Sequence, residues 1–93
     1  MLPGAGLAAD AAVMAQLVKA KNCVACHLMD SRVLGPSFKE IAARYRGNAE
    51  APALLTSHIQ HGSKDVWGPV PMPSNNQVTE EEARALASWV LTR

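Results

Sequence analysis

Apolar residues recur at helical spacing in four stretches of the chain, and the first two have clear start signals. The first stretch covers about residues 10–22 and begins at Asp10, a favourable N-cap residue. The second begins at Ser37, followed three residues later by Glu40 as in a capping box, and stops at Gly47. The predicted buried faces are Val13, Met14, Leu17 and Val18 in the first stretch, and Phe38, Ile41, Ala42 and Tyr45 in the second.

The other two stretches are delimited just as clearly. The third starts near Pro52, a residue suited to the first helical position, and ends at Gly62. The fourth starts at Thr79, with Glu82 completing a second capping box. Their apolar positions are Leu54, Leu55 and Ile59 in the third, and Ala83, Leu86, Ala87 and Val90 in the fourth.

Two intervening segments cannot be helical. Residues 30–36 end in Gly-Pro, and residues 63–78 contain Gly68, Pro69, Pro71 and Pro73, which deny the backbone both a helix and a central strand. No stretch alternates as a half-buried strand does. The sequence therefore predicts an all-α fold of about four helices with one long, stiff loop, and a loop of this length in a small domain is usually functional.

Composition adds a question about the core. The chain has 93 residues, of which 48% are hydrophobic, but it contains only four aromatic residues and sixteen alanines. This length predicts one domain. Short side chains fill little volume, and small domains commonly need a disulfide, a metal or another insert to become stable. A disulfide, a metal or another inserted group, rather than large side chains, is therefore expected to fill the centre of the core.

Charge and hydropathy narrow the function. The chain has nine basic and eight acidic residues, so it lacks the excess of positive charge that is typical of a nucleic-acid-binding protein. No run approaches the roughly 20 apolar residues of a membrane-spanning helix. The first twelve residues have no basic n-region and are interrupted by Asp10, so we do not expect an intact signal peptide there.

The only two cysteines, Cys23 and Cys26, are followed at once by His27. A thioredoxin-like redox pair would need a preceding strand, which the pattern lacks. A zinc site would need two histidines from His27, His58 and His61, and the latter two are spaced too closely for common zinc modules. The pattern C-x-x-C-H is the attachment signature of c-type haem, in which the thiols form thioethers and the imidazole becomes the proximal iron ligand.

The iron of a c-type haem would also need a second axial ligand, and methionine is the usual partner of histidine in cytochromes c. Met72 is the favoured candidate because it lies between Pro71 and Pro73 in the long loop, where a stiff backbone would hold a weakly binding thioether. The rivals are His58 and His61, which lie on one face of the third predicted helix.

Four segments together carry a resemblance to a known family. They are Cys-Val-Ala-Cys-His at residues 23–27, Gly-Pro at 35–36, Trp-Gly-Pro-Val-Pro-Met-Pro at 67–73, and Ala-Ser-Trp-Val-Leu at 87–91. The chain resembles the small bacterial class I cytochromes c of the c-551/c-552 type over residues 12–93. Residues 1–11 would then form an N-terminal extension, free to be mobile, ahead of a single domain.

The resemblance implies a small helical fold around one haem c, with the first and last helices crossing, and one-electron transport in the periplasm. It implies that Cys23 and Cys26 are the thioether cysteines, His27 the proximal ligand and Met72 the distal ligand. The remaining implied roles are a carbonyl acceptor for the proximal imidazole at Pro36, a hydrogen-bond donor to a haem propionate at Trp67, and a neighbour of the ligand sulfur at Asn75 or Asn76.

Two positions depart from the family pattern. Asn22 stands where a glycine is common, and His58 stands where a propionate-binding arginine is common. If His58 faced a propionate, that negative charge would stabilise its imidazolium, and more so in the reduced protein. The reduction potential would then fall as the pH rises through the histidine range.

Together these features predict an electron-transfer protein that is not an enzyme, because both axial positions of the iron are filled. The expected partners are redox proteins, such as a periplasmic reductase, a terminal oxidase or a membrane cytochrome complex, and the chain is expected to be monomeric. The alternatives are a haem domain excised from a larger reductase or oxidase, and a haem peroxidase or sensor with a labile sixth ligand. Several cations bias the haem-bearing half towards positive charge, as either a docking ring or an ordinary solvated surface: Lys19, Lys21, Arg32, Lys39, Arg44, Arg46 and Lys64.

Overall fold

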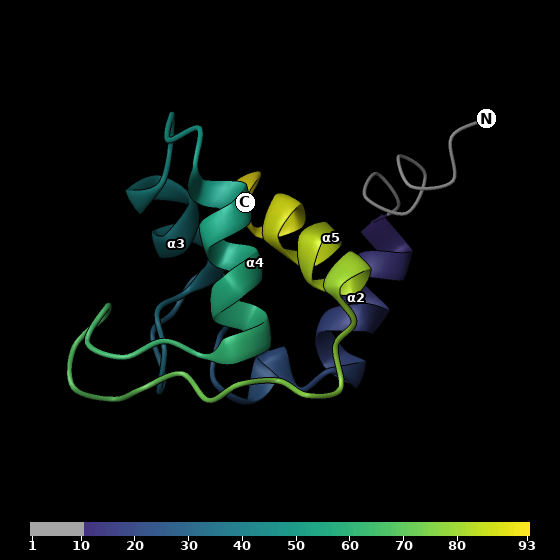
Figure 1. The fold of residues 1–93 in the computed structure, drawn as a ribbon, viewed down its shortest axis with the longest axis horizontal. Helices are drawn as coiled ribbons and strands as arrows, with labels where there is room; N and C mark the ends of the chain where they lie inside the picture. The colour runs from purple at the N-terminus through teal and green to yellow at the C-terminus, as the bar shows by residue number, and fades with distance from the viewer. Residues whose placement is uncertain (1–10) are drawn as a thin grey trace.

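The computed structural model describes residues 11–93, and its regular structure is helical throughout (Figure 1). Within those residues the β-structure is limited to two isolated bridges, one between His27 and Arg32 and one between Ser63 and Met72. The all-α prediction is therefore confirmed. The elements are α2 (Ala11–Ala20), the 3₁₀ turn η1 (Cys23–Ala25), α3 (Phe38–Arg44), α4 (Ala51–His61) and α5 (Glu80–Leu91).

Both predicted capping boxes are present. At the start of α3, Ser37 Oγ accepts from the Glu40 backbone N–H at 3.0 Å, and Glu40 Oε1 accepts from the Ser37 N–H at 2.8 Å. Thr79 and Glu82 make the equivalent pair of bonds at the start of α5, at 3.1 and 3.0 Å. These reciprocal bonds satisfy backbone donors that have no partner within the helix, so each start is fixed locally.

Two predicted helix ends need correction. The first helix stops at Ala20 rather than near residue 22, because Asn22 takes the left-handed conformation (φ 65°) and cannot continue a right-handed helix. The second predicted helix, α3, stops at Arg44 rather than at Gly47, and a turn connects the two residues. The predicted N-cap Asp10 and nearly all of the proposed extension, residues 1–11, lie outside the described residues.

The core forms where α5 meets the other three helices. Helix α5 contacts α2, α3 and α4, and Met14 of α2 is completely buried against this arrangement. The packing of α2 on α5 agrees with the expected contact between the first and last helices. Val13, on the predicted buried face of the first helix, is instead exposed, and so is Leu54, an apolar position of the third.

The long loop between α4 and α5 is the largest irregular part of the described chain. In Figure 1 it leaves the lower end of α4, swings outward, and returns beneath α4 to the start of α5, passing the segment that carries η1. None of the helices in residues 11–93 has the length and apolar character needed to cross a bilayer.

Candidate cofactor site

A cavity of about 650 Å³ is lined by two irregular parts of the chain and by the helices. One part is the cysteine segment, residues 23–36, and the other is the methionine loop, residues 62–78. The roof is apolar and comes from the helices, including Ile41 of α3, Leu55 of α4 and Leu86 of α5. The volume lies within the range of about 300–1,000 Å³ that is usual for ligand sites.

The structure brings nearly all the sequence-predicted site residues to this one cavity. The exception is His61, which does not line it and is exposed at the end of α4. The predicted residues that do line the cavity are Cys23, Cys26, His27, Pro36, His58, Trp67, Met72, Asn75 and Asn76.

Short-range backbone bonds fold the cysteine segment. The His27 N–H donates to the Cys23 carbonyl at 2.9 Å, and the Gly35 N–H donates to the Cys26 carbonyl at 2.9 Å. The turn is entered through Asn22 in its left-handed conformation, a conformation that glycine adopts freely and asparagine tolerates. This geometry explains how asparagine can stand where the family pattern has glycine.

The imidazole of His27 is fixed on several sides. Its Nδ1–H donates to the Pro36 carbonyl at 2.7 Å, and its ring stacks on Phe38 with centroids 5.5 Å apart. Phe38 in turn meets Trp89 edge to face, with centroids 5.1 Å apart. Because a carbonyl can only accept, this bond assigns the proton to Nδ1 and leaves the Nε2 lone pair for a metal.

Gly35 lies against the same imidazole. A Cβ added at this position would stand 2.7 Å from His27 Cε1, which is closer than any real Cβ contact. The glycine is therefore needed for close approach, and the Gly-Pro sequence serves both to admit the ring and to supply its acceptor.

The methionine loop is closed by a pair of backbone bonds. Ser63 and Met72 exchange N–H to carbonyl bonds, each 2.9 Å long. Gly62 precedes this pair with φ 82°, and a Cβ there would stand 2.5 Å from the Met72 carbonyl oxygen. Gly62 thus does more than end α4, as its sequence position suggested, because it also lets the backbone of residue 72 pack against the helix end.

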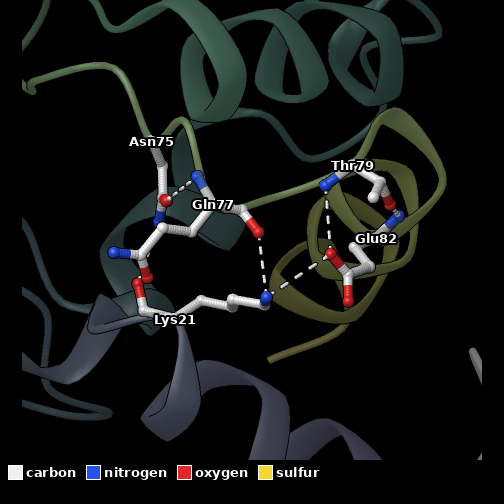
Figure 2. A network of polar contacts seen from close by, with 5 residues as sticks. All are labelled: Lys21, Asn75, Gln77, Thr79 and Glu82. Carbon is white, nitrogen blue, oxygen red and sulfur yellow. Dashed lines mark hydrogen bonds and ion pairs between the residues drawn. The ribbon is translucent and has the colours of Figure 1, made fainter.

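Past Met72, a polar network ties the loop to α2 and α5 (Figure 2). The Lys21 ammonium donates to the Gln77 carbonyl at 2.8 Å and pairs with Glu82 at 3.7 Å. The Asn75 amide donates to the Lys21 carbonyl at 2.9 Å and accepts from the Gln77 N–H at 3.1 Å. One N–H of Asn75 is used in this way, which leaves its second N–H and the Asn76 amide as candidate neighbours of the Met72 sulfur.

Burial and charge shift the acidity of two residues that line the cavity. Burial raises the pKa of the Cys23 thiol. Burial, and then the charge of Arg44, lower the pKa of His58. The surroundings that the chain itself provides therefore disfavour the His58 imidazolium, and the expected stabilisation by a propionate stays a prediction.

Most of the cations considered for a docking ring have partners within the chain. Arg32 pairs with Glu40 at 3.6 Å, and Lys39 pairs with Asp30 at 2.7 Å. Lys21 is held by the network already described, and Arg44 donates to the Val66 carbonyl at 2.8 Å. Three of the seven cations, Lys21, Arg32 and Lys39, are thus paired with carboxylates of the chain.

The parts played by Gly62, Ser63 and Arg44 were not predicted from the sequence. A glycine directly after a predicted helix indicates the helix end but not what packs against it. The contacts of Arg44 with Val66 and Trp67 join two distant segments, and no local pattern encodes such a pairing.

The donor set fits haem c better than the alternatives. Two cysteines, a histidine and a methionine line one largely apolar cavity. Across residues 11–93, no three His, Cys, Asp or Glu side chains gather as a metal cluster would require, which weighs against the zinc interpretation. A large, mostly apolar macrocycle matches both the volume and the lining.

Comparison with known proteins identifies close relatives. The family model described as cytochrome c matches residues 12–93. The chain is 49% identical over 77 residues to cytochrome c-551 of Pseudomonas aeruginosa, covering 83% of this chain and 73% of that protein. It is 46% identical over 78 residues to cytochrome c-552 of Nitrosomonas europaea, covering 84% and 76%. The crystal structure of wild-type cytochrome c552 from Nitrosomonas europaea superposes with a TM-score of 0.81, covering 84% of this chain and 96% of that one.

Proposed function

The chain belongs to the cytochrome c family, and from this premise we propose that it is a periplasmic one-electron carrier with His27 and Met72 as the axial ligands. The family implies one covalently bound haem c, and Cys23 and Cys26 fit its attachment motif. When bound, the haem iron supplies a centre that cycles between the ferric and ferrous states.

One observation carries the proposal: an imidazole and a thioether from two distant segments of the chain line the same apolar cavity. Pro36 orients His27 through the hydrogen bond to Nδ1, which leaves Nε2 as the coordinating atom. The Ser63 bridge and the close approach at Gly62 fix the backbone of Met72. Cys23 and Cys26, on the His27 side, would hold the group by two covalent bonds.

The other lining residues have supporting roles in this proposal. Trp67 and His58 would approach the propionates, and Asn75 or Asn76 would approach the Met72 sulfur. With both axial positions taken by side chains, no open position remains for a substrate, so the protein would transfer electrons rather than catalyse a reaction. Residues 12–93 would form the haem-binding domain and residues 1–11 an extension to it.

Partners would dock at the cavity mouth through apolar contact. Leu34 and Val70 line the cavity and are 60% and 55% exposed. The nearby charges of Arg32 and Lys39 are already paired within the chain. The rate of electron transfer to a periplasmic reductase, a terminal oxidase or a membrane cytochrome complex should therefore depend weakly on salt. The same one-electron transfer would take place if the chain were the haem domain of a larger reductase or oxidase.

The decisive experiment substitutes the proposed distal ligand. In Met72→Ala, the ferric protein should lose the weak long-wavelength band of methionine-bound haem and should bind added imidazole readily. Met29→Ala is the matched control, because Met29 is a partly exposed methionine on the cysteine segment. It should keep the wild-type spectrum.

Two results would overturn the proposal. One is an unchanged spectrum in Met72→Ala, which would assign the sixth position to another residue and revive a histidine ligand. The other is a wild-type protein that binds imidazole or peroxide as easily as the variant, which would favour a sensor or peroxidase. A pyridine haemochrome assay on each sample confirms that haem is attached.

A further inference from the structure

The middle of the methionine loop lacks backbone support of its own. Ser63 and Met72 bond to each other, but residues 64–71 take part in none of the hydrogen bonds between two backbone groups found in the described chain. Asp65 and Gly68 both have positive φ, at 59° and 109°, so the chain bends repeatedly there. Something outside the loop must determine its position.

Arg44, in the last turn of α3, contacts this unsupported stretch twice. Its guanidinium donates through Nη1 to the Val66 carbonyl at 2.8 Å. Its Cζ also lies 4.4 Å from the centroid of the Trp67 ring. Val66 and Trp67 are adjacent, so one side chain holds both the backbone and the largest side chain of the loop.

A second arginine approaches the same ring more distantly. Arg32 Cζ lies 5.8 Å from the Trp67 centroid, near the limit at which a cation and an aromatic face attract each other. Arg32 follows the cysteine segment's motif closely and forms an isolated bridge with His27. Trp67 therefore connects the methionine loop both to α3 and to the part of the chain that carries the imidazole.

The chemistry of these contacts requires arginine. A guanidinium is flat, so it can lie on an indole face while its in-plane N–H groups donate to a carbonyl at its edge. A lysine ammonium can make one of these contacts at a time and has no flat face to stack. The geometry at Arg44 uses both properties together.

We propose that Arg44 is a positioning residue for Met72, which fastens the methionine loop to α3 through Val66 and Trp67, with Arg32 as a weaker second contact. The inference rests on the proposed function, in which Met72 is the distal ligand. Arg44 does not touch the ligand sulfur. It acts by limiting how often the loop opens away from the cavity.

The test compares Arg44→Ala, Arg44→Lys and Arg32→Ala in the haem-loaded protein. The matched control is Arg46→Ala, because Arg46 is an exposed arginine two residues along with no contact to the loop among the interactions described. Hydrogen exchange in the reduced protein reports opening at the Ser63 and Met72 amides, which bond to each other. The affinity of the ferric protein for added imidazole reports how easily Met72 is displaced.

Arg44→Ala should raise both the exchange rate and the imidazole affinity by about 5- to 30-fold, the change that corresponds to losing 1–2 kcal/mol of local stability. Arg44→Lys should recover only part of the loss, Arg32→Ala should show a smaller change, and Arg46→Ala should match the wild type. Amides of the α5 core should exchange at the wild-type rate in all four, which separates loop opening from general destabilisation.

Equal behaviour of Arg44→Ala and Arg46→Ala would overturn the inference, and so would full rescue by lysine. Both results would leave the proposed function standing as long as the wild-type ferric spectrum shows methionine ligation. If the wild type lacks that signature and Met72→Ala binds imidazole no better, the proposed function fails instead.

Discussion

The cysteine segment and the methionine loop both line the cavity, but they are built in different ways. In the cysteine segment the bonds are local: the His27 imidazole reaches Pro36 nine residues away, and the Phe38 N–H reaches the Leu28 carbonyl at 2.8 Å. The methionine loop has one local pair of bonds, between Ser63 and Met72, and otherwise relies on distant partners. Asn75 bonds to a residue 54 positions away, Lys21 to one 56 away, and Arg44 to one 22 away.

This difference indicates how each ligand group would behave. Closing a short loop costs little conformational entropy, so the cysteine segment can hold His27 with little help from the rest of the fold. The methionine loop keeps its place only while α2, α3 and α5 are packed. Regions with few local bonds and exposed backbone open most readily, so the thioether is expected to be the more easily displaced ligand.

The largest effect should come from removing the covalent attachment. We expect Cys23→Ser/Cys26→Ser to be largely unfolded, because the apolar roof around the cavity of about 650 Å³ would lose the group it packs against. The difference between the cysteine segment and the methionine loop would then disappear, because neither would be ordered. Far-UV circular dichroism and thermal unfolding would measure it.

The single variant Cys26→Ser, which keeps one attachment point, should fall between the double variant and the wild type in thermal stability. A double variant with wild-type helix content and a cooperative unfolding transition would contradict the expectation. It would mean that the helices pack without the cofactor.

A smaller effect should come from closing the gap at Gly62. Gly62→Ala places a Cβ 2.5 Å from the Met72 carbonyl at φ 82°, so we expect a loss of about 3 kcal/mol in unfolding free energy. Gly35→Ala is its counterpart in the cysteine segment, with a Cβ 2.7 Å from the His27 ring. The first should weaken methionine ligation and the second should disturb the imidazole, as haem NMR of the two variants would show.

Gly47→Ala is the matched control for backbone strain. Gly47 also has a positive φ, 78°, but a Cβ there meets nothing within 4 Å. Gly47→Ala should lower the unfolding free energy by only about 1–2 kcal/mol, because alanine is disfavoured in the left-handed conformation. It should leave the haem spectrum unchanged. If Gly47→Ala and Gly62→Ala cost the same, contact with Met72 is not what makes Gly62 necessary.

The same difference explains what could be predicted from the sequence. Capping boxes at Ser37 and Thr79 are local signals, and both predicted helix starts were found. The motif at residues 23–27 and the Gly-Pro at 35–36 are equally local, and the structure brings both segments to the lining of one cavity. A pattern of a few residues was sufficient because the physical contacts span only a few residues.

The methionine loop was harder to predict for the converse reason. Proline spacing singled out Met72, and the structure places it on the cavity. The loop's supports were not foreseen, because Arg44 looked like one surface cation among several. The lowered pKa of His58 was not foreseen either, since it depends on burial and on Arg44 from another helix. Such effects arise only when distant segments pack together.

The smallest effect should be a pH dependence, which distinguishes the two cavity-lining histidines. His27 has its Nδ1–H bound to Pro36 and is proposed to bind iron through Nε2, whereas burial and the charge of Arg44 lower the pKa of His58. Reduction removes one positive charge from the iron centre and so favours protonated His58. The potential should therefore fall as pH rises, over a range below the ordinary histidine pKa of about 6.5.

The slope should stay well under about 59 mV per pH unit, the limit for one proton per electron. It should vanish in His58→Ala and persist in His61→Ala, the exposed histidine three residues along the same helix. Potentiometric titration from pH 4 to 8 would measure it. A slope that survives in His58→Ala would assign the proton to another group near the cavity, and one centred above the ordinary histidine pKa would mean that a negative charge outweighs Arg44 at His58.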